Sequence, residues 1–316
     1  GPAPGTLLMP GAQVGQLEVL GVLHDLVLDD QSHGLIVGEA RASRLARVPV
    51  EHGSLLLTLD PSTGAVLAVE AEANQYIPFA LDEVNLDFQI LGPAPNNPDE
   101  VEILIAASRK EKVEDRVAIA EAAGLRPRVM DVESYATQEA FRLITPSLPA
   151  NGRDQNIAFV DVGAHITHFY VLRNGQFLFS RDQAFGGNQL THDIQRAFNL
   201  SPEEAESAKK NQGLPENYDA DVLQPFMETL ALEITRALQF FFTSTAYNQV
   251  DQIVLAGGCA QLPGLDELVA KRAGVATVIA NPFASMQVSD RIRPRQLAQD
   301  APMLTIAAGL AMRGFE

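Results

Sequence analysis

The stretch Asp161-Val162-Gly163-Ala164-His165-Ile166-Thr167 decides the fold of this chain. An apolar run over residues 157–160 predicts a strand that delivers the Asp161 carboxylate into a glycine turn, from which a second strand departs. Backbone N–H groups in such a turn can form a concave anion site, and a carboxylate at its edge can hold Mg²⁺ through water. The stretch is therefore a candidate phosphate-binding loop, although an ordinary hairpin turn has the same pattern.

A second glycine turn, Leu255-Ala256-Gly257-Gly258-Cys259-Ala260, follows another apolar run over residues 252–255. The pattern behind it predicts a helix that runs to about Ala273 and stops at Gly274. Paired glycines let a flat ligand approach the backbone closely, and a helix N-terminus favours negative charge. Taken alone, the turn is equally consistent with a plain strand-to-helix connection.

Between the two turns lies Phe185-Gly186-Gly187-Asn188, followed by a predicted helix and by the charged run Pro202–Lys210. Taken alone, the charged run indicates a solvated helix face with Glu–Lys pairs. The order of these features nevertheless resembles the actin-like ATPase fold. That fold presents a second phosphate loop, a ribose-side helix and an adenosine loop in this sequence.

From about Glu70 to its C-terminus, the chain resembles more closely the PilM family, the cytoplasmic actin-like proteins of FtsA type in the type IV pilus assembly platform. The resemblance rests on the two glycine turns and on four further motifs: Glu72–Phe79 (EANQYIPF), Ala106–Glu111 (AASRKE), Asp131–Ala136 (DVESYA) and Leu238–Ser244 (LQFFFTS). It implies an α/β, actin-like (ribonuclease H-like) ATPase fold with an FtsA-type inserted subdomain.

The resemblance also implies a division of the chain. An inserted αββαβ subdomain is expected over residues 69–132, and nucleotide-binding actin-like subdomains over residues 133–316. Members of the family begin with a strand and a first phosphate loop, but residues 1–68 contain no such motif. This atypical segment is open to three explanations: a diverged subdomain, a substituted segment or a mistranslated 5′ region.

The implied ligand is ATP with Mg²⁺, and the resemblance assigns its contacts. The backbone of Gly163, Ala164 and His165 faces the β- and γ-phosphates, the Thr167 hydroxyl lies nearby, and Asp161 belongs to the Mg²⁺ shell. The ribose and adenine side is assigned to Gly186, Gly187, Asn188, Glu206, Lys209 and Lys210. The residues expected under the adenosine are Gly257, Gly258 and Cys259.

As a function, the resemblance implies a cytoplasmic ATP-binding scaffold that supports pilus biogenesis and twitching motility and is at most a weak ATPase. Its expected partner is the short N-terminal tail of PilN, held between the inserted and first subdomains, which makes the scaffold peripheral to the inner membrane. Other pilus platform proteins and self-association are further expected contacts. Two alternatives are an actin-superfamily phosphotransferase of sugar-kinase or acetate-kinase type, and a structural adaptor with a dead nucleotide site.

Composition agrees with a globular protein that works through a partner. The 316 residues are 46% hydrophobic and 20% charged, and the formal net charge of −17 argues against binding nucleic acid or an anionic membrane directly. No apolar run reaches the roughly 18 residues that span a bilayer. The single cysteine, Cys259, cannot form an internal disulfide, which favours a reducing cytoplasm.

Periodicity predicts most of the remaining elements. The expected strands cover residues 85–91, 101–107 and 128–132, and a hairpin over 157–181 is expected to turn at Asn174-Gly175. The expected helices cover residues 111–123, 228–245 and 302–313. The second of these helices is expected to turn inward Leu230, Ile234, Ala237, Leu238 and Phe241, with Phe240 and Phe242 broadening the same face.

Overall fold

The computed structural model describes residues 55–59, 77, 79–94, 97–127, 129–211, 213–289 and 292–312. The segment expected to lack a first phosphate loop, apart from residues 55–59, lies outside the described residues. So do the first helix of the inserted subdomain and motif residues 72–76. The chain divides into two units. Unit 1 comprises residues 1–140, 289–292 and 306–316, and unit 2 comprises residues 141–288 and 293–305.

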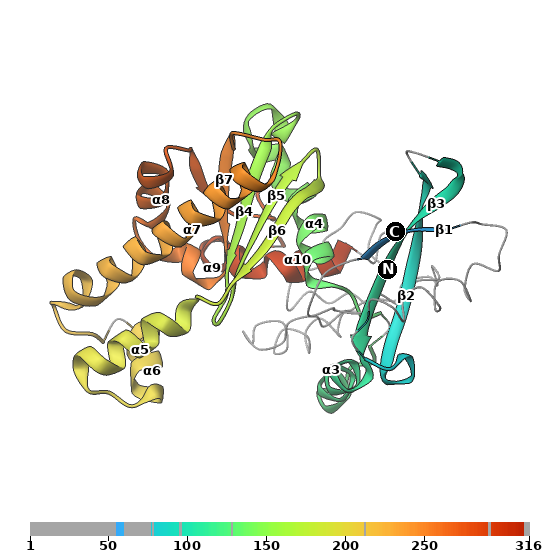
Figure 1. Ribbon diagram of the computed structural model, residues 1–316. Coiled ribbons are helices and arrows are strands. Elements are labelled where there is room, and N and C mark those ends of the chain that lie inside the picture. Colours follow the sequence, from blue (N-terminus) through green and yellow to red (C-terminus); the bar gives the residue numbers. More distant parts are fainter. Residues whose placement is uncertain are drawn as a thin grey trace. The chain divides into compact units, whose positions relative to one another are not determined.

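Unit 1 contains a three-stranded antiparallel sheet of order β1-β3-β2 (Figure 1). The elements in and beside this sheet are β1 (Leu55–Leu59), η2 (Leu81–Glu83), β2 (Val84–Ala94), β3 (Asn97–Arg109) and α3 (Lys110–Ala122). The predicted strands over 85–91 and 101–107 are confirmed as a longer hairpin. β1 pairs with β3 from Leu55↔Ile105 to Leu59↔Val101, so a strand from the atypical segment completes this sheet.

The strand predicted over residues 128–132 is wrong for its described part, because residues 129–132 are irregular. The buried Asp131 carboxylate accepts a hydrogen bond from the Val132 N–H at 2.8 Å. The Val132 carbonyl in turn accepts the N–H groups of Tyr135 and Ala136, each at 3.0 Å. These local bonds start helix α4 (Glu133–Ile144), so this motif is a helix entry and not a strand.

Within unit 1, two helical segments touch backbone to backbone. Helix α10 (Thr305–Met312) brings Gly309 so close to α4 that a Cβ there would lie 1.7 Å from the Ala136 carbonyl oxygen. Ala136 and Leu310 are buried at this contact, and Val129 and Ile306 pack around it. Only glycine permits this approach.

Unit 2 is built on a five-stranded sheet of order β6-β5-β4-β7-β8. Its strands are β4 (Asn156–Val162), β5 (Thr167–Arg173), β6 (Gln176–Gln183), β7 (Gln252–Ala256) and β8 (Thr277–Ile279). β4, β5 and β6 pair antiparallel, whereas β4, β7 and β8 pair parallel. The predicted hairpin turn is confirmed, since Asn174 and Gly175 both have positive φ, 51° and 76°.

Helices cover both faces of this sheet, and every residue of the central strand β4 is buried. Ala158, Val160 and Val162 of β4 pack into one core with the helices over residues 224–244 and 265–273, while Ile157 and Phe159 pack on the opposite face. The helical elements of unit 2 beyond the shared α4 are η3 (Thr145–Ser147), η4 (Pro149–Gly152), α5 (Gly187–Phe198), α6 (Pro202–Asn211), η5 (Asp219–Leu223), α7 (Gln224–Ser244), η6 (Gly258–Gln261), α8 (Leu265–Ala273), α9 (Pro294–Asp300) and η7 (Ala301–Leu304).

Helix α7 confirms the predicted inward face, since all five residues named for it are buried. Phe240 departs from the prediction because it is 48% exposed, with the Arg181 guanidinium 4.4 Å from its ring centre. The residues predicted as a final helix form η7 followed by α10. In the described part of the chain, no helix is both long enough and apolar enough to cross a bilayer.

Candidate functional site

Two glycine turns meet at one edge of the unit 2 sheet. β4 and β7 run parallel and stay paired as far as Asp161↔Ala256, so the turns that follow them lie side by side. Gly257 has a φ of +82°, and a Cβ there would lie 2.4 Å from the Val162 carbonyl oxygen and 2.5 Å from Asp161 Oδ1. The second turn therefore packs directly against the Asp161 carboxylate, which is 7% exposed.

The Gly-Gly-Asn segment is fastened to the first turn. The Gly187 N–H donates to the Gly163 carbonyl at 2.9 Å, and the Asn188 N–H donates to the Ala164 carbonyl at 2.8 Å. A Cβ on Gly186 would lie 2.5 Å from both of these carbonyl oxygens. The start of α5 and the first glycine turn thus form one hydrogen-bonded body.

The first turn closes on itself through the Gly163 N–H, which donates to the Ile166 carbonyl at 3.0 Å. At its exposed tip, the Asn188 side-chain amide lies 3.2 Å from Nε2 of His165. Thr167 is buried, and its hydroxyl donates to the Phe185 carbonyl at 2.7 Å. This hydroxyl therefore secures the β6–α5 connection.

The charged residues of α6 join α5 in one network. Lys209 Nζ lies 2.6 Å from Glu206 Oε2 and donates to Thr191 Oγ1 at 2.8 Å. The Thr191 hydroxyl donates to the same carboxylate oxygen at 2.9 Å, and Lys210 Nζ lies 3.3 Å from Glu206 Oε1. The three predicted α6 residues are therefore together, and Thr191, on the facing helix, belongs to their network although the sequence analysis did not name it.

This network sets the charge of Glu206. Partial burial raises the pKa of the Glu206 carboxyl, but hydrogen bonds from Lys209 and Thr191, together with the Lys209 charge, more than offset this. The pKa of Glu206 consequently lies below its ordinary value of 4.5. The carboxylate stays ionised and holds both lysine side chains on one side of α6.

The lowered pKa of Glu206 predicts a pH-dependent contribution to stability. Glu206→Gln should lower the unfolding free energy at neutral pH, and its difference from the wild type should disappear as pH falls below about 4.5 through the lower pKa of the folded state. The effect should be small because the Glu206 side chain is 37% exposed and partly screened. Urea unfolding across pH 3–7 measures it.

Glu203→Gln is the matched control, because Glu203 is an exposed acid of the same helix that has no part in the Glu206 hydrogen-bond network. A Glu206→Gln difference that stayed constant down to pH 3, or matched the Glu203→Gln profile, would contradict the assignment.

The two glycines of the second turn differ in what surrounds them. A Cβ on Gly258 would meet only Met303, whose Sδ would be 3.8 Å away, in contrast to the closely packed Gly257. Cys259 is buried, and its Sγ lies 3.1 Å from where a Cβ on Gly187 would be. Cys259 therefore fills space between the second turn and α5, which links all three glycine segments.

The helix predicted after this turn is confirmed as α8, which ends at Ala273 with Gly274 as its C-cap, as expected. Residues 258–261 form the short turn η6, and α8 starts only at Leu265, after Pro263 and Gly264 interrupt the helical path. Gly264 has a φ of +80°, which sets the direction in which α8 departs. The N-terminus of α8 is therefore not the group directly behind Gly257 and Gly258.

One contact near the first turn was missed. His168 Nδ1 lies 2.7 Å from Asp182 Oδ1, and strand register places Asp161, His168 and Asp182 in a row across β4, β5 and β6. Counting from the Asn174-Gly175 turn would pair His168 with Arg181. A bulge opposite Val171 and Leu172 shifts the register by one residue and lets both Leu178 and Phe179 pack against the same core.

Metal binding by protein groups alone is not favoured here. The described ranges contain no group of three or more His, Cys, Asp or Glu side chains that could hold an ion. A single carboxylate fits Mg²⁺, which is commonly held by one or two carboxylates together with substrate phosphates and water. Asp161 suits that arrangement because it lies at the meeting point of the two turns.

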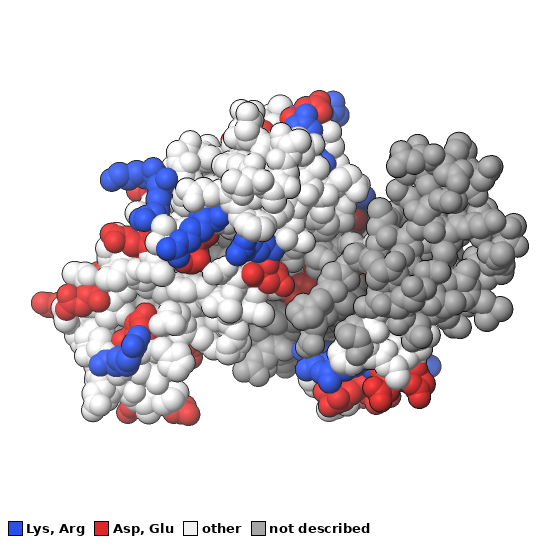
Figure 2. All heavy atoms as spheres, viewed as in Figure 1, with Lys and Arg blue, Asp and Glu red and all other residues white. Residues whose placement is uncertain are grey.

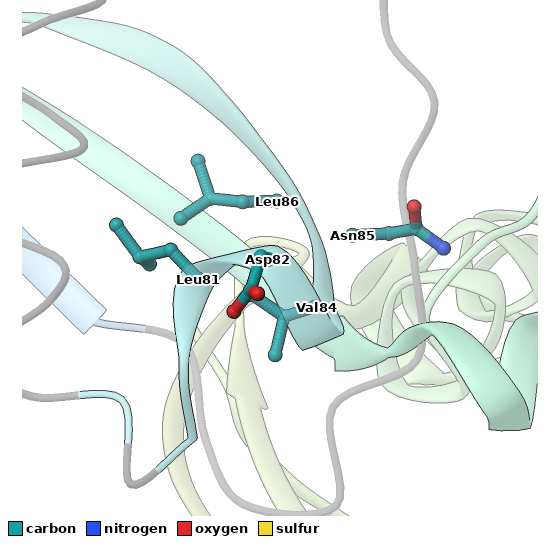
Figure 3. A pocket seen from close by; sticks show the side chains of 5 residues that line it. All are labelled: Leu81, Asp82, Val84, Asn85 and Leu86. Atoms are coloured by element: carbon teal, nitrogen blue, oxygen red, sulfur yellow. The ribbon is translucent and has the colours of Figure 1, made fainter.

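Each unit also has a surface hollow whose lining residues are not those of the glycine turns. In unit 1, a hollow of about 460 Å³ is lined by Leu81, Asp82, Val84, Asn85 and Leu86 at the start of β2. Figure 3 shows Leu81 and Leu86 together on one side and Asn85 directed away from them. In unit 2, a hollow of about 490 Å³ is lined by Leu200, Glu203, Glu204, Ser207, Ala208 and Gly213.

Among the described residues on the face seen in Figure 2, Lys and Arg form no extended basic area. Lys and Arg side chains lie among Asp and Glu side chains, with uncharged surface between them. Ion pairs of the described residues include those of Glu206 with Lys209 and Lys210 on α6, and that of Arg196 with Asp193.

Comparison with known proteins gives a family match over most of the chain. The family model described as type IV pilus assembly protein PilM matches residues 65–315. Its start lies close to Glu70, where the motif resemblance also begins.

A solved structure and a curated protein are also similar. The structure of a PilM–PilN type IV pilus biogenesis complex matches with a TM-score of 0.68 and 30% identity, covering 100% of this chain and 90% of that chain. Ethanolamine utilization protein EutJ of Escherichia coli (strain K12) is 28% identical over 117 residues, 37% of this chain and 38% of that protein. The chain thus matches less than half of the length of EutJ.

Proposed function

Because the chain belongs to the family of type IV pilus assembly protein PilM, we propose that it is an ATP-binding scaffold for pilus assembly that holds the N-terminal tail of PilN. The predicted α/β fold of actin-like type is confirmed by this membership. The observation that carries the proposal is the match to a solved PilM–PilN complex along the entire chain. Pilus biogenesis and twitching motility are the processes that such a scaffold would support.

The arrangement of the three glycine segments supports the nucleotide part of the proposal. Their packing brings the Asp161 carboxylate, the exposed first turn and the second turn to one edge of the sheet. Because the Gly163 N–H donates within its own turn, the backbone N–H groups of Ala164 and His165 would be the donors to phosphate. Asp161 would hold Mg²⁺, which would neutralise phosphate charge, and Gly258 would face the adenosine.

The roles proposed for the other residues follow from their contacts. Gly186 and Gly187 allow the close approach of α5 to the first turn, and Asn188 orients His165. Lys209 and Lys210, held by Glu206, would present positive charge on the ribose side, and Cys259 fills the space beneath. Nucleotide-dependent closure around ATP would then alter the partner groove, with hydrolysis at most slow.

The peptide part of the proposal rests on unit 1. Phe79 is 43% exposed beneath the Arg109 guanidinium, whose carbon lies 5.6 Å from the ring centre. Lys110 donates from Nζ to the Asp82 carbonyl at 2.6 Å, beside the hollow of Figure 3. An exposed aromatic ring, a cation and a hollow lined by both polar and aliphatic residues suit an extended peptide, which offers backbone groups as well as apolar side chains.

We predict that recruitment depends on peptide and not on lipid. A fluorescent PilN-type N-terminal tail should bind with an affinity that changes by less than about threefold between 50 and 300 mM salt, because its core contacts are apolar. Phe79→Ala should weaken binding about tenfold, and Ile119→Ala, an equally exposed apolar residue on α3, should not. Fluorescence anisotropy measures both.

Flotation with vesicles supplies the opposing test. The acidic chain should not float with anionic vesicles unless the peptide is anchored in them. Strong vesicle binding without the peptide, combined with no peptide affinity, would overturn the scaffold proposal.

A further inference from the structure

We propose that the Met303 side chain covers one face of the nucleobase and so makes the site selective for ligands that carry an aromatic base. This inference rests on the proposed nucleotide site and deepens it, since it identifies which part of the ligand the second turn recognises. Met303 belongs to none of the sequence motifs, and the structure alone brings it to the site.

The exposure of Met303 is unusual for its position. It lies in η7, whose other residues Ala301, Pro302 and Leu304 are all buried, with Ala301 and Leu304 at 0% and 6% exposure. Met303 is 39% exposed. The three buried residues thus hold η7 in place, and Met303 presents a long, apolar, unbranched side chain at the surface.

The position of Met303 is fixed relative to the second glycine turn. The Gly257 N–H donates to the Pro302 carbonyl at 2.9 Å, which ties η7 to that turn one residue before Met303. The thioether then lies beside Gly258, since a Cβ on Gly258 would be 3.8 Å from Met303 Sδ and 4.0 Å from its Cγ. Bare glycine backbone and a thioether therefore flank the same space.

These two surfaces suit a flat aromatic ring. Glycine backbone admits a ring at close range, and a methionine sulfur makes favourable contacts with aromatic groups. The same turn contacts the Asp161 carboxylate through Gly257, so the apolar surface and the metal-binding carboxylate belong to one ligand site. Phosphate would be directed toward Asp161 and its Mg²⁺, and the base toward Met303.

The test uses the full chain with ¹³C-labelled methionine methyl groups. The protein has six methionines, and Met303→Leu identifies the Met303 signal by its loss while keeping the side-chain volume. ATP·Mg²⁺ should move the Met303 methyl signal upfield through the ring current of the adenine. Inorganic tripolyphosphate with Mg²⁺ at the same concentration should leave that signal in place.

Affinity provides the second measurement. Met303→Ala should weaken ATP binding by about two- to tenfold, the range expected for losing a sulfur–aromatic contact. Met286→Ala is the matched control, because Met286 is a partly buried methionine of the same unit outside the site, and it should not change the affinity.

The outcomes separate this inference from the proposed function. Suppose that calorimetry shows ATP binding by the wild type. Then no movement of the Met303 signal, or an unchanged affinity in Met303→Ala, would overturn this inference and leave the proposed nucleotide site standing. Equal signal movement with ATP and tripolyphosphate would also overturn it. Absence of any ATP binding by the wild type would overturn the proposed nucleotide site and this inference together.

Discussion

Replacing Asp161 with asparagine is expected to weaken ATP·Mg²⁺ binding by about 10- to 100-fold while unfolding stays cooperative. This range is the one found on losing an outer-shell group of a metal site, which suits a carboxylate that holds Mg²⁺ through water. Asparagine keeps the shape of the side chain beside Gly257, so the change removes charge without opening a cavity. Calorimetry in Mg²⁺ and in EDTA measures the effect.

The metal dependence makes this prediction specific. In EDTA the variant should bind ATP at least as well as the wild type, because a carboxylate close to the phosphates repels them when no metal lies between. Asp193→Asn is the control, since Asp193 pairs with Arg196 on α5, away from the turns, and its loss should not alter ATP affinity. Unchanged ATP·Mg²⁺ affinity in Asp161→Asn would remove Asp161 from the site.

The adjacent glycines of the second turn should respond in opposite ways to valine. Gly257→Val should destabilise the fold severely, by more than about 4 kcal/mol, because it forces a side chain into the Val162 carbonyl at a positive φ. That loss is a large part of the roughly 5–15 kcal/mol that stabilises a typical domain. Reduced expression and a non-cooperative melt would be the observable result.

Gly258→Val should instead leave the fold nearly intact and abolish nucleotide binding. A Cβ at this position meets nothing closer than 3.8 Å, so the melting temperature should fall by only a few degrees. The added methyl groups would occupy the space proposed for the adenosine. Thermal melts and calorimetry on both variants decide the matter. A Gly258→Val chain that still binds ATP, or that unfolds as readily as Gly257→Val, would show that this turn is only structural.

The sequence predicted correctly those elements whose conformation is set by residues close together in the chain. The Asn174-Gly175 turn and the inward face of α7 follow from positive φ and from helical spacing, and both are confirmed. The strand expected over residues 128–132 failed because Asp131 and Val132 bond locally to start α4. The backbone groups of these residues could pair with a neighbouring strand or bond locally at the start of a helix. An apolar pattern alone does not reveal which of the two occurs.

The segments that form the candidate site could be predicted from the sequence, but the contacts between their residues could not. The order of the glycine turns named Asp161 and Gly257, but only the structure shows that they touch. The role of the Thr167 hydroxyl depends on its hydrogen bond to Phe185, and the role of Met303 depends on its position beside Gly258. Both partners lie far along the chain. A single sequence carries no signal for such distant pairs.

The partner of His168 in the β5–β6 hairpin depends on whether β6 takes up its one additional residue in the bulge. Leu178 is the additional residue of β6, because Leu172 pairs with Phe177 and Val171 with Phe179. Removing Leu178 would erase the bulge yet leave Asp182 opposite His168, whereas straightening the strand with Leu178 in place would bring a guanidinium there. The bulge, which takes up one residue of β6, thus sets the sign of the charge that faces this imidazole.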